Sequence, residues 1–157
     1  MKQIIRREKI EEKIEDERKL SNEDNIIIHG LEEDKEETHF VGQLLKDLNV
    51  NTKPNYVSRI GKGSTNSARP IKVVFKDSHV KYRFMSRLKE LKRHDKYSKI
   101  SITDDLTRIE RDLLKEWKER ANKRNQKETN KEYVWRVRGS PRKRLYLKKI
   151  YCKARSV

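Results

Sequence analysis

The spacing of apolar and polar positions divides the chain into helix-like and strand-like segments, beginning with a charged helix. Residues 2–20 contain no Gly or Pro, and oppositely charged side chains recur at helical spacing, which predicts a helix over the segment 1–24. Ile10 and Ile14 fall on one face of this helix, whereas polar residues fill the other seam positions. The end of a coiled coil and an isolated charged helix are therefore both compatible with this segment.

Between residues 25 and 105, four strand patterns alternate with two helix patterns. Thr38 is the expected cap of the first helix, and Asp77 or Ser78 is the expected cap of the second, whose apolar stripe ends at Leu91. The order β-α-β-β-α-β predicts an α+β domain of the split βαβ, ferredoxin-like type, with two helices on one face of a four-stranded antiparallel sheet. Such a scaffold carries no function by itself. The expected strands are Asn25–Leu31, Tyr56–Ile60, Ile71–Phe75 and Lys99–Thr103.

The segment 106–157 predicts a helix followed by a β-hairpin. Thr107 and Glu110 form a capping box, and apolar positions between Leu106 and Ala121 continue an amphipathic helix to about residue 126. The hairpin that follows is expected from two strands and a Gly-Ser-Pro turn: Tyr133–Arg138, Leu145–Ile150 and Gly139–Pro141.

The composition and the net charge indicate which class of partner the protein binds. The 157 residues include 41 Lys and Arg against 25 Asp and Glu, a net charge of +16. Residues 106–157 hold 18 of these basic residues and six of the acidic ones, and no acidic residue follows Glu132. Only 32% of the residues are hydrophobic, which supports one compact domain with extensions. We expect a polyanionic partner, nucleic acid before a membrane surface, and no apolar run reaches the ~20 residues of a membrane span.

The sequence carries no recognisable catalytic or metal-binding pattern. Gly61–Thr65 lacks the glycine spacing of a phosphate-binding P-loop, and a strand rather than a helix follows it. The four His are scattered and Cys152 is the one cysteine, so neither a zinc site nor a disulfide framework is predicted. Asp104 and Asp105 are adjacent and would point to opposite sides, and solvation and the helix dipole explain the acidic loop Glu32–Glu37. We predict no catalytic residue, metal or other cofactor.

Basic and aromatic residues together indicate binding of single-stranded RNA or DNA. Tyr133, Trp135 and Tyr146 interleave with Arg136, Arg138 and Arg144 in the tail. Cations neutralise phosphates, and aromatic faces stack unpaired bases for roughly 1–3 kcal/mol each. The aromatic residues have a second interpretation, because Tyr133, Trp135 and Val137 alternate along one strand and can instead pack against the preceding helix. The residues predicted to bind nucleic acid are Arg59, Lys62, Arg69 and Lys72 around the second-to-third strand loop, and Tyr133, Trp135, Arg136, Arg138, Arg142, Lys143 and Arg144 in the tail.

Three segments between residues 15 and 126 resemble parts of a known family. A charged helix leads directly into NIIIHGL, and Arg59–Phe75 looks like a basic loop that runs into a third strand. Ile100–Trp117 (ISITDDLTRIERDLLKEW) is similar to a last strand, an Asp-Leu-Ser/Thr helix start and a tryptophan one turn past a basic pair. On these segments the chain resembles the first-open-reading-frame RNA-binding proteins of LINE-type retrotransposons, which carry an RRM-like domain and a C-terminal domain.

The resemblance implies a function. Proteins of this family are non-catalytic, trimerise through an N-terminal coiled coil, coat single-stranded RNA and act as nucleic-acid chaperones during reverse transcription. It implies RNA contacts from Arg59, Lys62, Arg69 and Lys115, a homo-oligomer formed through the N-terminal helix, and a cytoplasmic ribonucleoprotein, with the nucleus as the alternative location. Two departures are visible, because the family's basic pair is here Leu114–Lys115 and the N-terminal helix is short.

The expected sheet surface argues for backbone-directed binding. Ordinary RRMs stack bases on aromatic residues of the first and third strands, where this chain has Ile27 and the Lys72–Val73 region. Weakly sequence-specific, salt-sensitive binding to phosphates is therefore expected. The alternative function is a protein-interaction module, in which the helical arm and the open sheet bind a partner chain and the basic tail serves localisation.

Overall fold

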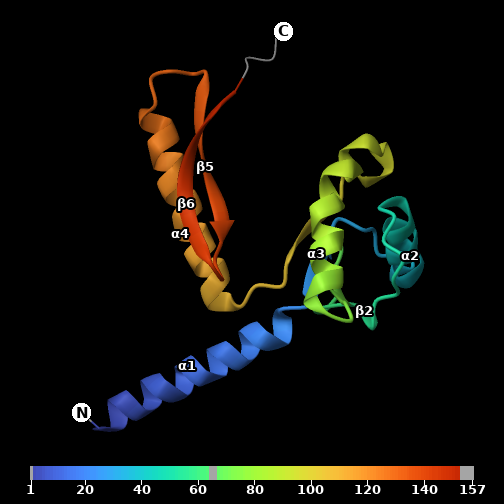
Figure 1. The fold of residues 1–157 in the computed structure, drawn as a ribbon, viewed down its shortest axis with the longest axis horizontal. Helices are drawn as coiled ribbons and strands as arrows, with labels where there is room; N and C mark the ends of the chain where they lie inside the picture. The colour runs from blue at the N-terminus through green and yellow to red at the C-terminus, as the bar shows by residue number, and fades with distance from the viewer. Residues whose placement is uncertain (1, 64–66, 153–157) are drawn as a thin grey trace. The chain divides into compact units, whose positions relative to one another are not determined.

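The computed structural model describes residues 2–63 and 67–152 and divides into two compact units, Met1–Asp105 and Leu106–Val157 (Figure 1). The fold is mixed α+β, with an N-terminal helix, antiparallel sheets and a C-terminal β-hairpin, which confirms the predicted class. Among the described residues, no helix combines the length and the apolar character that a bilayer span requires.

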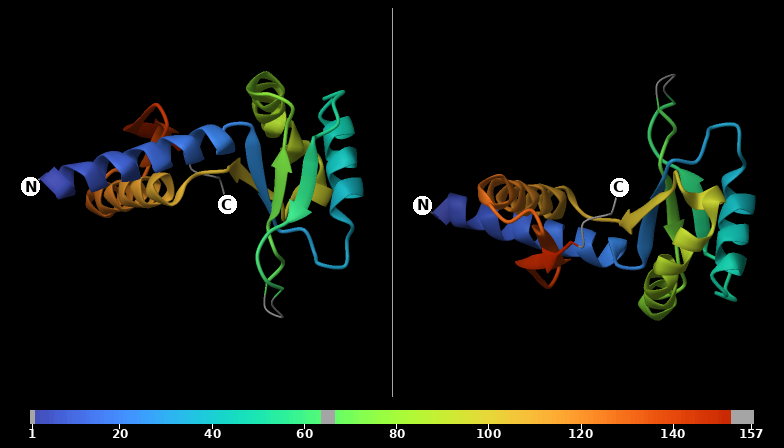
Figure 2. Two further views of the ribbon diagram at one scale, coloured as in Figure 1. Left: turned by 90° about the horizontal axis from the view of Figure 1, so that it is seen from below. Right: turned by 90° about the horizontal axis from the view of Figure 1, so that it is seen from above.

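The N-terminal unit contains a four-stranded antiparallel sheet in the order β2-β3-β1-β4 (Figure 2). Because β3 lies antiparallel between β1 and β2, these two strands run in the same direction. The β1–α2 loop and the β2–β3 loop therefore leave the sheet at the same end. The elements of this unit are α1 (Lys2–Asn22), β1 (Asn25–His29), α2 (Glu37–Asp47), β2 (Tyr56–Arg59), β3 (Ile71–Val74), α3 (Ser78–Arg87), the 3-10 helices η1 (Leu88–Arg93) and η2 (Asp95–Tyr97), and β4 (Ser101–Asp104).

One face of this sheet forms the core with α2 and α3. Ile26 on β1 pairs with Val73 on β3, so alternate residues of the two strands point to the same side. Fully burying such a side chain stabilises a fold by roughly 1.5–3 kcal/mol. The buried residues that share this core are Ile26, Ile28, Leu31, Val41, Leu44, Leu45, Leu48, Val50, Ile71, Val73, Phe75, Val80, Phe84 and Tyr97.

The ends of the helices differ from the sequence predictions in two places. Glu36, not Thr38, caps α2, because its carboxylate is long enough to accept from the backbone N–H groups of both Thr38 and His39. Asp77 caps α3 as predicted, since its side chain accepts from the N–H of Val80. The apolar stripe expected to continue this helix to Leu91 instead passes into the 3-10 helix η1.

The C-terminal unit consists of α4 (Arg108–Lys127) and a hairpin of β5 (Tyr133–Ser140) and β6 (Arg144–Tyr151), which run alongside the helix (Figure 1). The predicted capping box of Thr107 and Glu110 is present. The predicted turn position is wrong by two residues. Gly139 still pairs with Leu145, and the N–H of Lys143 donates to the carbonyl oxygen of Ser140, so the turn spans 141–143.

Gly30 directly follows β1, and its substitution tests whether the chain requires glycine at this position. Its φ is 97°, and an added Cβ would overlap the carbonyl oxygen of Lys99. We expect Gly30→Ala to destabilise the protein by roughly 1–3 kcal/mol in urea unfolding. Gly42→Ala is the matched control, because Gly42 lies in α2 with no atom within 4 Å of an added Cβ. It should stabilise the protein by about 0.5–1 kcal/mol, and equal effects of the two substitutions would contradict a requirement for glycine at position 30.

Candidate nucleic-acid interface

The two faces of the β5–β6 hairpin have different roles, and one of them packs on α4. Leu145 is 7% exposed and Ala121 of α4 is 5% exposed. The main chain of Trp135 exchanges two hydrogen bonds with the side chain of Asn125, at 2.6 and 3.0 Å. Leu145 pairs with Gly139, so the burial of Leu145 puts the odd-numbered positions of β5 on the face that meets the helix.

Trp135 is held on this face by polar contacts as well as by packing. Its indole Nε1 donates to Glu128 at 3.2 Å, and the Arg124 guanidinium lies 4.6 Å from its ring centroid. Lys149 pairs with the same Glu128 carboxylate at 2.9 Å and lies 4.8 Å from the ring centroid of Tyr133. The hydrogen bond from Lys149 is the main cause of a lowered Glu128 pKa. These contacts favour the packing interpretation for Trp135.

The opposite face of the hairpin carries only cations, one tyrosine and small or apolar residues. Arg138 pairs across the strands with Tyr146, and Arg136 pairs with Lys148. Tyr146 is 46% exposed. Among the described residues, no acidic group pairs with these cations, and Arg138 makes only a 3.4 Å contact to the carbonyl oxygen of Val137. We call this surface the hairpin outer face; its exposed members are Arg136, Arg138, Arg144, Tyr146 and Lys148.

A basic groove of about 510 Å³ adjoins this surface along α4 and β6. Arg120 stacks over the ring of Trp117, with its guanidinium carbon 5.2 Å from the centroid, and pairs with Glu116 at 3.3 Å. Half of the lining residues are Arg or Lys, and none is acidic. The groove is lined by Trp117, Arg120, Lys123, Arg124, Arg144, Leu145, Tyr146 and Leu147.

Two other predicted residues of the C-terminal unit are exposed, and one is structural. Lys115 on α4 and Lys143 in the hairpin turn are exposed. The Arg142 side chain is instead 19% exposed and donates from Nε to Glu110 at 2.9 Å. Glu110 is 3% exposed and also accepts from the N–H of Thr107 at 2.9 Å. Arg142 therefore ties the hairpin turn to the start of α4.

The Arg59 side chain in the N-terminal unit is also engaged in intramolecular contacts. Its side chain is 5% exposed and lies under the β1–α2 loop. Its two terminal nitrogens donate to four backbone carbonyl oxygens, and its Nε lies 3.6 Å from Glu37. The acceptors are Leu31 at 3.1 Å, Glu32 at 2.5 Å, Lys35 at 3.0 Å and Arg69 at 3.1 Å.

Arg69 and Lys72 also meet carboxylates, whereas Lys62 has no carboxylate partner among the residues that the structure describes. Arg69 pairs with Glu33, from Nη2 at 3.0 Å and from its backbone N–H at 2.6 Å. Hydrogen bonds from the Arg69 side chain, and then from its backbone, lower the pKa of Glu33 to about 2. Lys72 pairs with Asp105 at 3.1 Å. Lys62 is exposed and shares a shallow hollow of about 390 Å³ with Arg69.

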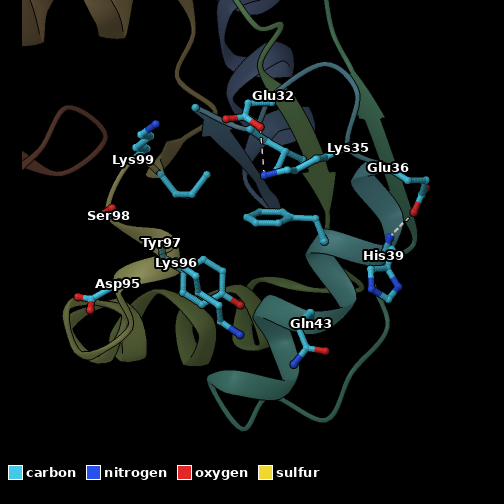
Figure 3. Close-up of a pocket in the computed structure, with 14 residues that line it drawn as sticks. Glu32, Lys35, Glu36, His39, Gln43, Asp95, Lys96, Tyr97, Ser98 and Lys99 are labelled. Atoms are coloured by element: carbon cyan, nitrogen blue, oxygen red, sulfur yellow. Dashed lines mark hydrogen bonds and ion pairs between the residues drawn. The ribbon is translucent and has the colours of Figure 1, made fainter.

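A larger pocket, of about 590 Å³, lies between the β1–α2 loop, α2 and the segment before β4 (Figure 3). Phe40 and Tyr97 meet edge to face on its wall, with centroids 5.9 Å apart. The Tyr97 hydroxyl donates to Asp47 at 2.6 Å, and burial together with this bond raises the pKa of Tyr97. Lys96 pairs with the same carboxylate at 2.6 Å, and its hydrogen bond is the main cause of a lowered Asp47 pKa. Tyr97 and Lys96, which line the pocket, are therefore both bound to Asp47, which does not line it.

The structure thus brings together only part of the predicted site. Arg136, Arg138 and Arg144 share the hairpin outer face, whereas Arg59, Arg69, Lys72 and Arg142 are paired inside their own units. Lys148 was not among the predicted residues, and Tyr146 was noted in the sequence only as an aromatic residue interleaved with the arginines of the tail. Both lie on the same face as Arg136 and Arg138.

Comparison with known proteins adds no assignment, because no protein-family model and no curated protein matches the chain. Within residues 2–63 and 67–152, no three His, Cys, Asp or Glu side chains are grouped so that they could hold a metal ion.

The Glu33–Arg69 pair predicts an unusual acid titration. Glu33 should titrate near pH 2 rather than at the ordinary 4.5, followed by carboxyl NMR. Because the pKa is lower in the folded chain, the stability that the pair contributes is complete above about pH 4.5 and is lost as the pH falls toward 2. Arg69→Ala should return the pKa of Glu33 toward 4.5. A wild-type titration near 4.5 would show that the pair does not form in solution.

Because Arg142 pairs with Glu110, we predict that substitutions of two neighbouring turn residues, Arg142 and Lys143, change the stability of the protein by different amounts. Arg142→Ala leaves the buried Glu110 carboxylate without its arginine, so we expect a loss of about 2–3 kcal/mol in urea unfolding. Lys143→Ala is the control, since Lys143 is exposed, and it should change stability by less than about 0.5 kcal/mol. Similar losses for the two variants would argue against a structural role for Arg142.

Proposed function

We propose that the protein is a non-catalytic, weakly sequence-specific single-stranded RNA- or DNA-binding protein, and that its C-terminal unit makes the main contacts. The observation that supports this most is the hairpin outer face, where four exposed cations surround Tyr146 and, among the described residues, no carboxylate neutralises them. A cation without an intramolecular partner is free to bind a phosphate, and phosphate contacts dominate such binding.

The arrangement of this surface favours a single strand over a duplex. Tyr146 is half exposed between Arg138 across the strand pair and the basic groove along α4. An exposed ring beside cations can stack an unpaired base, for roughly 1–3 kcal/mol, while the cations contact the flanking phosphates. Stacking accepts any base, so the expected sequence preference is weak.

The N-terminal unit supports an RRM-like interpretation of its fold. The strand order β2-β3-β1-β4, with α2 and α3 packed on one face, has the connectivity of a split βαβ domain. Ile27 and Lys72 pair on the other face, where ordinary RRMs carry stacking aromatics. We therefore assign this unit a secondary, backbone-directed role. Coating and chaperoning of nucleic acid, as in the LINE-type family, within a cytoplasmic or nuclear ribonucleoprotein, completes the proposal.

The N-terminal helix supports a second role in association. Ile10 and Ile14 lie one turn apart on α1 and are 49% and 41% exposed. Two exposed isoleucines on one helix face favour a contact with another chain, either a further copy in a coiled-coil trimer or a partner protein. This is the observation that keeps the protein-interaction module as the alternative function.

Charge reversal on the hairpin outer face tests the proposal. We expect Arg136→Glu/Arg138→Glu to weaken binding to all single-stranded sequences alike, measured by fluorescence anisotropy at several salt concentrations. Loss of two phosphate contacts should reduce the slope of log affinity against log salt by about 1.4. Arg83→Glu/Arg93→Glu makes the same charge change at exposed positions of α3 and η1 and should have a much smaller effect. Equal losses in the two variants, or a loss confined to one sequence, would contradict binding at this face.

A further inference from the structure

The Glu33 carboxylate accepts hydrogen bonds from a group of donors that would also suit a larger anion. It accepts from the backbone N–H of Arg69 at 2.6 Å and from the guanidinium of the same residue, at 3.2 Å from Nε and 3.0 Å from Nη2. The Nε of Arg59 lies 3.8 Å from the same carboxylate. A guanidinium fork combined with a backbone N–H is an arrangement that binds carboxylate and phosphate oxygens alike.

The Arg59 side chain and the backbone of Arg69 are held in place independently of Glu33. Arg59 donates to the carbonyl oxygens of Leu31, in the β1–α2 loop, and of Arg69, at the end of the β2–β3 loop, both at 3.1 Å. The N–H of Ile60 donates to the carbonyl oxygen of Pro70 at 2.9 Å, which continues the strand pairing up to Arg69. The backbone that carries the Arg69 donors is therefore fixed by contacts that remain when the Glu33 side chain moves.

The ion pair is also open to exchange with solvent. The Arg69 side chain is 35% exposed and the Glu33 side chain is 36% exposed. Arg69 also lines the shallow hollow that it shares with a second cation, Lys62. Because solvent reaches both side chains, an external anion can approach the guanidinium and compete with Glu33 for it.

We propose that Arg69 forms a phosphate site that the chain closes with its own Glu33, which acts as a competing anion in cis. The phosphate would come from the backbone of a bound single strand, and this source rests on the proposed function. In the free protein the site is filled, and a strand engages it only by displacing Glu33. The β1–α2 loop thereby limits how strongly the N-terminal unit contributes to binding.

The test uses the full chain and two probes, inorganic phosphate and a mixed-sequence single-stranded oligonucleotide. Glu33→Gln keeps the size of the side chain but removes its charge, and we expect it to bind phosphate at least threefold more tightly than wild type. Binding to every variant is measured by calorimetry, and in the variants that keep Arg69 it is located by the NMR signal of the Arg69 Nε–H group. Glu32→Gln is the matched control, because Glu32 pairs with Lys35 rather than with an arginine (Figure 3). It should leave phosphate affinity nearly unchanged.

A double-mutant cycle separates the proposed site from a general effect of charge. In the background of Arg69→Ala, the gain from Glu33→Gln should disappear. A gain that persists without Arg69, or a folded Glu33→Gln protein with wild-type affinity for phosphate, would overturn the proposal. Glu33→Ser, which also removes the carboxylate, provides the same comparison if the glutamine variant is unstable.

The oligonucleotide distinguishes this proposal from the proposed function. If phosphate binds Glu33→Gln more tightly but no variant binds the oligonucleotide, the anion site is supported and nucleic-acid binding is not. In the opposite case, wild type binds the oligonucleotide through the hairpin outer face, and Glu33→Gln changes the affinity for neither phosphate nor the oligonucleotide. The proposed competition by Glu33 is then wrong, and the proposed function stands.

Discussion

A guanidinium withdrawn from water must find partners for its five N–H donors, and Arg59 donates four hydrogen bonds to the backbone and turns its Nε toward Glu37, which holds the β1–α2 loop against the end of the sheet. Four backbone carbonyl oxygens and Glu37 surround it. Because β1 and β2 run in the same direction, their following loops meet at one end, and a single side chain at the end of β2 fixes both. The acidic loop Glu32–Glu37 is therefore best explained as the partner of two arginines, and not by solvation and the helix dipole alone.

Ion pairing with carboxylates also determines which of the many cations remain available to bind a polyanion. In the N-terminal unit, carboxylates neutralise Arg69, Lys72 and Lys81, which are partly or largely buried. In the C-terminal unit, Glu110 and Glu128 hold Arg142 and Lys149. No carboxylate reaches the hairpin outer face among the described residues. Part of the surplus charge that the composition reveals is thus placed by the fold on one face of a two-stranded sheet, where it can act on a polyanion.

Features set by neighbouring residues could be predicted from the sequence, and features set by tertiary contacts could not. The capping box of Thr107 and Glu110 is local and was predicted, whereas the cap of α2 was missed because a long Glu36 side chain replaced the usual short one. The separation of Trp135 from Tyr146 depends on the register of the hairpin, in which Trp135 pairs with Lys149 and Tyr146 with Arg138. Alternation along one strand does not fix that register across a turn. The partners of Arg59 required the topology of the sheet, which places two distant loops together.

Two kinds of cation on one chain should respond differently to salt. An unpaired arginine on the hairpin outer face releases a condensed counterion from the strand when it binds a phosphate, which makes the affinity fall as salt rises. Arg69 already has an anion, so binding of a phosphate there exchanges one ion pair for another and leaves Glu33 to be solvated. Salt weakens both pairs, and its effects largely cancel. The salt slope of the whole protein therefore counts the open cations of the hairpin, whereas Arg69 contributes to the affinity with little effect on the slope.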